Sequence, residues 1–137
     1  MKTTIFTLVA IPLLLSGCAT NPRVERATDL GFGFRRVIMA EPSQSSFESI
    51  GHFEYLYFGD RRLCQVGACS VSPSGRYAAY QDGPSGNLFL FCRVDSRATQ
   101  LNARFVALVD TFTWHENAHA VEAHFTPGQG VQTFALP

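Results

Sequence analysis

The chain has 137 residues, of which 46% are apolar, and its 11 basic residues balance 11 acidic ones. This length accommodates a single domain, and a charged fraction of only 16% with 12 phenylalanines predicts a packed core, which excludes a disordered chain. A formal net charge of zero also disfavours nucleic acid as the main partner.

The first 17 residues have the layout of a secretory signal peptide. Lys2 is the only lysine of the chain, and an almost unbroken apolar run follows from Ile5 to Leu15. A run of this length is too short for a transmembrane helix, which needs roughly 20 residues. A short positive start, an apolar stretch and then small residues therefore predict a signal peptide over residues 1–17.

The small residues that end this segment form a known motif. Leu15-Ser16-Gly17-Cys18 resembles the lipobox of bacterial lipoproteins at each of its four positions. The resemblance implies that the signal is cut before Cys18, that the Cys18 thiol receives a diacylglycerol and that the new N-terminus is acylated. Acyl chains contribute about 0.8 kcal/mol per buried methylene, so such an anchor would be effectively permanent.

The residue after the lipidated cysteine indicates the membrane. Ala19 stands where the familiar inner-membrane retention signal has aspartate, so the resemblance implies the outer membrane. The sequence leaves open whether the domain faces the periplasm or the outside, and the periplasm is the expectation. Without residues 1–17, ten arginines and eleven acidic residues give a formal charge of −1, with no polybasic patch for nucleic acid or lipid.

Residues 18–30 are predicted to be a lipidated N-terminus and tether, because the chain from Ala19 to Asp29 is polar and aperiodic. The remaining residues, 31–137, are predicted to form the β domain. Its first residues, Gly31-Phe32-Gly33-Phe34, are interpreted as a flexible entry strand, since no phosphate-binding lysine or helix follows them.

Short runs of β-branched and aromatic residues alternate with turn residues through the first half of the domain, and no amphipathic helix is evident before residue 115. This pattern predicts an all-β fold. The predicted strands are 35–40, 53–58, 61–66, 69–72, 76–81 and 88–94, with turns at 59–60, 73–75 and 82–86.

Three cysteines remain if Cys18 is lipidated: Cys64, Cys69 and Cys92. An oxidising periplasm favours one disulfide and one free thiol, although the sequence does not determine which cysteines pair. If Cys69 and Cys92 lie on the first and third strands of one sheet, they are about 10 Å apart and too distant to bridge. Cys64 with Cys69 is therefore the preferred pair.

An internal repeat appears at a constant offset of 43 residues. Residues 71–80 and 88–91 align with residues 114–123 and 131–134. The first copy, which contains Ser72-Pro73-Ser74-Gly75, resembles a TolB-type β-propeller blade, with Ser74 in place of the usual aspartate. The second copy keeps the Trp114 that this family favours but lacks the Pro and Gly of the turn. Asn117 is expected to take the left-handed turn position there.

A closed propeller needs at least four blades of about 40 residues, and this chain holds two repeats. Such a chain must either close as an oligomer or fold as an open structure. We expect a small antiparallel sandwich or open meander of two propeller-like repeats. Its exposed strand edges are where a partner strand would add.

One motif suggests a different function. His115-Glu116-Asn117-Ala118-His119 matches HExxH, which on a helix places two imidazoles on one face to bind zinc while the glutamate activates water. His124 or Glu122 would complete the ligand set. The arrangement would be similar to zincin metalloproteases, although those families have a bulky apolar residue where Asn117 stands.

The same segment also fits a strand. Val121, Ala123 and Phe125 alternate with Glu122 and His124, the period-2 pattern of a half-buried strand, and the preceding residues 110–114 favour strand or turn. We therefore expect a non-enzymatic interaction or structural module, with no catalytic residue, metal or cofactor. It would bind an envelope protein or self-associate, and a small zinc hydrolase remains the alternative.

Overall fold

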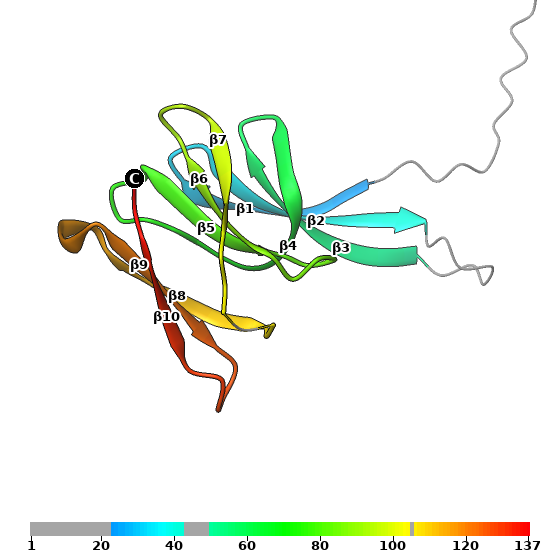
Figure 1. Cartoon of the computed structure of the whole chain (residues 1–137). Helices are drawn as coiled ribbons and strands as arrows, with labels where there is room; N and C mark the ends of the chain where they lie inside the picture. Colours follow the sequence, from blue (N-terminus) through cyan, green and yellow to red (C-terminus); the bar gives the residue numbers. More distant parts are fainter. Residues whose placement is uncertain (1–22, 43–49, 105) are drawn as a thin grey trace, which may run out of the picture.

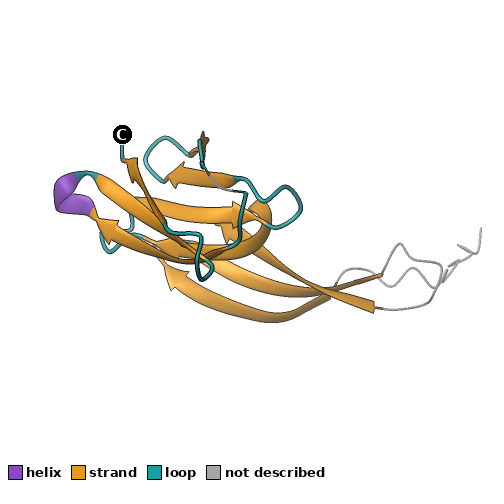
Figure 2. Ribbon diagram, turned by 60° about the horizontal axis from the view of Figure 1, so that its bottom comes forward, coloured by secondary structure: helices purple, strands orange, loops and turns teal. Residues whose placement is uncertain are grey.

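The computed structural model describes residues 23–42, 50–104 and 106–137, and in this part of the chain the fold is nearly all β (Figure 1). The strands form two open antiparallel sheets, one of seven strands and one of three. A single 3-10 helix connects two neighbouring strands of the smaller sheet (Figure 2). The predicted all-β fold with two sheets is confirmed. Neither sheet closes into a ring.

The seven-stranded sheet is a simple meander in which each strand pairs with the next. The smaller sheet has the order β10-β9-β8. The strands of the first sheet are β1 (Arg23–Gly31), β2 (Phe34–Pro42), β3 (Ile50–Phe58), β4 (Arg61–Val71), β5 (Tyr77–Asp82), β6 (Leu88–Cys92) and β7 (Arg97–Leu101). The second sheet comprises β8 (Val109–His115), the 3-10 helix η1 (Glu116–Ala118), β9 (Ala120–Phe125) and β10 (Val131–Ala135).

The predicted tether is in large part a strand. From Arg23 onward the chain forms β1, which pairs with β2 along the edge of the larger sheet. Its first seven residues are exposed, which explains the polar, aperiodic sequence that predicted a tether. Exposed charges are typical of edge strands, because they discourage pairing with other chains. Residues 18–22 of the predicted tether, and Cys18 with them, lie outside the described residues.

The glycine-rich segment between β1 and β2 is a tight turn and not a flexible entry strand. Gly31, Phe32 and Gly33 have successive φ values of 85°, 55° and 87°. Glycine adopts positive φ freely, whereas a bulky residue such as Phe32 does so at a cost and must be held in place. The ring of Phe32 lies against Gly75, in the turn between β4 and β5, and the Arg93 guanidinium lies 5.6 Å from the ring centroid.

The repeat offset of 43 residues relates strands of the larger sheet to strands of the smaller one. β5 and β9 each have six residues and begin 43 positions apart, as do the five-residue strands β6 and β10. Cross-strand pairs also correspond, since Tyr80 faces Phe89 in the first unit as Ala123 faces Gln132 in the second. Even the irregularity in β4 after Val66 recurs in β8 after Val109. The two repeats therefore share one hydrogen-bonding register.

The turns of the two repeats differ. The Ser72–Gly75 segment makes a hydrogen-bonded turn in which the Gly75 N–H donates to the Ser72 carbonyl at 2.8 Å. Its counterpart is η1, and the residue with left-handed geometry there is His119 (φ 51°), not Asn117 as predicted. The 3-10 turn delays the left-handed residue by one position relative to Gly75.

β5 is buried on both faces, because alternate side chains enter two different cores. Tyr77 and Ala79 pack against the second sheet. Ala78 and Tyr80 pack against Phe34 and other residues from the first strands of the larger sheet. The core toward the second sheet also includes Leu88, Leu90, Val109, Val121, Ala123, Phe125, Phe134 and Leu136.

The larger sheet curls strongly. The rings of Phe34 in β2 and Phe91 in β6 pack edge to face with centroids 5.8 Å apart. In a flat sheet, strands four places apart would be separated by about 19 Å. Curling therefore brings β2 and β3 over β5 and β6 and creates a third layer.

The side chain of Gln81 in β5 hydrogen-bonds to the segment that connects the two sheets. This side chain is buried, and its amide nitrogen donates to the carbonyls of Gly86 at 3.0 Å and Ala107 at 2.9 Å. Its oxygen accepts from the Val109 N–H at 2.9 Å. These bonds satisfy a buried amide and fix the point at which β8 begins.

Gly75→Ala and Gly86→Ala form a matched pair, because the two glycines have φ values of 72° and 73°. A Cβ at Gly75 would lie 2.0 Å from a ring carbon of Phe32, whereas a Cβ at Gly86 would meet nothing within 4 Å. Strain alone should cost about 1 kcal/mol at Gly86, and strain with the clash about 3 kcal/mol at Gly75. Urea unfolding measures both, and equal losses would show that the Phe32 contact is absent.

Candidate functional site

The HExxH segment does not form the helix that a zincin site requires. His115 is the last residue of β8, Glu116–Ala118 is a single 3-10 turn, and His119 is left-handed. In an α-helix the i and i+4 side chains lie one turn apart on the same face, and a strand end followed by a 3-10 turn and a left-handed residue does not place them so. In the described residues, no group of three or more His, Cys, Asp or Glu side chains is placed to hold a metal ion. This geometry does not support the zinc site of the alternative hydrolase interpretation.

The Glu116 carboxylate binds Ser74, whereas the hydrolase interpretation needs it to activate a water molecule. Its carboxylate accepts hydrogen bonds from the Ser74 N–H at 3.1 Å and from the Ser74 hydroxyl. These bonds, the hydroxyl bond first, lower the pKa of the Glu116 carboxyl below its ordinary value. Because Ser74 belongs to the first repeat and Glu116 to the second, the carboxylate joins their two turns.

The other candidate ligands lie on the outer face of the second sheet. The carboxylate of Glu122 lies between His115 Nε2 at 3.2 Å and His124 Nε2 at 3.3 Å, and the Thr113 hydroxyl lies 3.0 Å from His124 Nε2. Val121, Ala123 and Phe125 are buried as the strand pattern predicts. This face is largely polar, and Val131 of β10, opposite His124, is exposed on it as well.

The predicted Cys64–Cys69 disulfide is not supported. Both residues lie in β4, where five residues of extended strand span about 16 Å, well beyond the roughly 7 Å between Cα atoms that a disulfide can bridge. Cys64, Cys69 and Cys92 are all free. Cys69 and Cys92 do lie on the first and third strands around β5, and they contact different cores.

Burial makes Cys64 and Cys69 poor nucleophiles. Burial raises the pKa of the Cys64 thiol to about 12 and also raises the pKa of Cys69. Since the thiolate is the reactive form, these raised pKa values disfavour reaction of both thiols. Cys64 and Cys69 thus act as core residues of the curled sheet.

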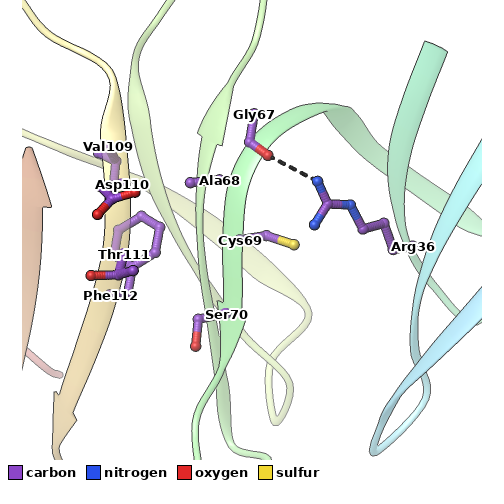
Figure 3. A pocket seen from close by; sticks show the side chains of 9 residues that line it. All are labelled: Arg36, Gly67, Ala68, Cys69, Ser70, Val109, Asp110, Thr111 and Phe112. Atoms are coloured by element: carbon purple, nitrogen blue, oxygen red, sulfur yellow. Dashed lines mark hydrogen bonds between the residues drawn. The ribbon is translucent and has the colours of Figure 1, made fainter. Parts of the chain in front are cut away.

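A groove runs between β4 and β8, where the first strands of the two repeats lie side by side (Figure 3). The register shifts of both strands fall within this groove, and they interrupt the regular backbone pairing there. The cavity has a volume of about 480 Å³. Its lining consists of Arg36, Gly67, Ala68, Cys69, Ser70, Val109, Asp110, Thr111 and Phe112.

Two polar side chains of this groove, Arg36 and Ser70, make structural contacts. The Arg36 guanidinium pairs with Glu54 and donates to the Gly67 carbonyl at 3.5 Å. The Ser70 hydroxyl accepts from Trp114 Nε1 at 2.9 Å, which links the repeats a second time. No serine or cysteine in the described ranges hydrogen-bonds to a histidine.

A second groove, of about 710 Å³, lies at the opposite border of the sandwich. Residues of β6 and β7 form one wall, and the end of β10 with Leu136 and Pro137 forms the other. β10 contains Val131-Gln132-Thr133-Phe134-Ala135, with no charged residue. The repeat predicted a strand here, but its place at the edge of the smaller sheet becomes evident only once the strand order is known.

Comparison with protein-family models, with curated proteins and with solved structures found no match. None of the described residues belongs to a helix that is long and apolar enough to cross a membrane.

The Glu116–Ser74 contact predicts a pH dependence. The folded state lowers the carboxyl pKa, so the contact stabilises the fold above the ordinary value of 4.5 and this contribution is lost as the pH falls through the lowered value. Glu116→Gln should therefore reduce stability at pH 7 and flatten its decline below about pH 4.5. Urea unfolding from pH 7 to pH 3 measures this effect.

A double-mutant cycle with Ser74→Ala provides the control. If Glu116 acts through Ser74, the losses from the two single changes should not add in the double variant. Additive losses would mean that the carboxylate does not join the turns. The same conclusion would follow if the stability of Glu116→Gln declined at acid pH as steeply as that of the wild type.

Proposed function

We propose that this protein is a lipid-anchored outer-membrane protein whose β domain acts as a protein-interaction or structural module of the cell envelope. The lipobox at Leu15–Cys18 supports the anchor and its location. An N-terminal lipid makes the membrane one partner, and an envelope protein or a second copy is the other. The proposal includes no cofactor and no nucleic acid.

The observation that carries the interaction role is the open border at β10. Natural proteins protect strand edges with charge, bulges or proline, since an unpaired edge is a template for another strand. β1, at the far edge of the larger sheet, carries Arg23, Glu25, Arg26 and Asp29. β10 carries none of these protections and pairs with β9 without a register shift. An edge of this kind fits a role in strand pairing.

The zinc-hydrolase alternative lacks comparable support. It would need His115 and His119 on one helical face and Glu116 free to activate water. The 3-10 turn and the Ser74 contact argue against both requirements. The interaction module is therefore the function that the geometry favours.

Cys18→Ser tests the anchor, because the proposal gives this thiol the first acyl chain. Cells that produce the variant should release the protein from the membrane fraction or retain the uncut form. Fractionation with and without detergent, together with the mass of the product, distinguishes these states. Processing at the usual site with continued need for detergent would contradict the lipid anchor.

A further inference from the structure

We propose that an extended strand of a partner protein pairs antiparallel with β10 and lies in the groove beside β7. This inference rests on the proposed function and specifies its binding surface. The strand would be uncharged overall and would turn small or apolar side chains toward the groove. Three independent features of the border lead to this assignment.

The first feature is the strand that occupies the equivalent position in the other repeat. β6 and β10 correspond at the offset of 43, and β6 pairs with β7 through Leu88–Leu101 and Leu90–Thr99. Within the described residues, β10 pairs with one strand, β9, and the Gln132 side chain bonds to the Asn102 carbonyl and the Arg104 N–H. A partner strand at β10 would thus take the place that β7 takes at β6, opposite Val131 and Thr133.

The second feature is the direction of the backbone groups of β10. The Leu136 N–H donates to the His119 carbonyl at 2.7 Å, and the Gly130 carbonyl accepts from the Phe125 N–H at 3.0 Å. In an antiparallel ladder such bonds involve alternate residues. Val131, Thr133 and Ala135 therefore direct their N–H and C=O groups away from β9, where an added strand would bind them.

The third feature is the groove itself. It lies between β7 and the chain after β10 and has a volume of about 710 Å³. Leu90, Leu101 and Leu136 contribute apolar surface, and Arg97 and Thr99 line it from β7. A strand paired with β10 would have one face toward this surface, which would bury its alternate side chains.

A single strand fits this position better than the matching edge of a second copy. The inner side chains of β10, Phe134 among them, already pack on β5 and β6 with Leu136. In a second copy, the face of β10 that would have to enter the groove is already covered by the seven-stranded sheet of that copy. The occupant therefore needs a free face, which an extended segment of another protein has.

A synthetic peptide of residues 95–103 (DSRATQLNA) is a suitable probe, since it contains β7, the strand that fills the equivalent place. It is titrated into the full-length protein in detergent while amide hydrogen exchange is followed. Saturating peptide should slow exchange at Val131, Thr133 and Ala135 at least tenfold, with little change at β1. Absence of saturable binding at millimolar peptide, or protection elsewhere, would overturn the proposal.

Thr133→Pro and Thr133→Ala form the matched pair of variants. Proline removes an outward N–H but leaves the bonds to β9, whereas alanine keeps the N–H and shortens the side chain. Thr133→Pro should weaken peptide binding at least tenfold, and Thr133→Ala should bind as wild type does. Equal binding by both variants would contradict strand pairing.

A second variant keeps the test valid if Thr133→Pro unfolds. Thr99→Arg places a long charged side chain in the groove from the exposed β7 and should also weaken binding at least tenfold. A concentration-dependent dimer that Thr133→Pro abolishes would assign the edge to a second copy and overturn the partner strand. The Cys18→Ser result is independent of all these outcomes, so failure of the anchor and failure of the edge are distinguishable.

Discussion

The turn at Ser72–Gly75 is the point on which the assembly of the three layers depends. On one side it receives the ring of Phe32 from the β1–β2 turn, and on the other Ser74 binds the Glu116 carboxylate of the second repeat. Within it, buried Ser72 accepts a hydrogen bond from the Tyr77 N–H at 3.1 Å. One tight turn thus joins the curled strands, the central β5 and the second sheet.

This arrangement explains how two propeller-like repeats form a stable domain without closing a ring. β5 is covered on one face by the second sheet and on the other by the curled strands β2 and β3. On the outer face of the second sheet, Glu122 lies between His115 and His124. The described sandwich contains two repeats, and β10, at one edge, carries no charged residue of its own.

Much of the fold was predictable from the sequence, because in the central strands the residues that are buried are also the ones that form a local apolar pattern. Apolar runs between turns located β5 and β6, and the alternation of Val121, Ala123 and Phe125 located β9. The offset of 43 from β6 located β10. The polar edge strands β1 and β7 were missed, because their own side chains are almost all exposed and their pairing depends on the neighbouring strand.

The candidate site was less accessible to sequence reasoning for the same physical reason. A contact such as Glu116 with Ser74 joins residues 42 positions apart, and no local pattern encodes it. HExxH indicated a helix only if its flanks were helical, yet the strand preference of residues 110–114 continued into a hairpin. Cys64 and Cys69 were predicted to lie in two separate strands, 61–66 and 69–72, and to pair, but both lie in the one extended strand β4, which holds them apart.

Native-state hydrogen exchange on the full-length protein tests the central claim, that the repeats form one cooperative unit joined at the Ser72–Gly75 turn. Amides of β5 and β9 should exchange only by global unfolding and give the same free energy of opening. Gly75→Ala should lower both values equally. If β9 instead opens at a lower free energy than β5, or responds independently of Gly75, the second sheet folds as a separate unit and the account is contradicted.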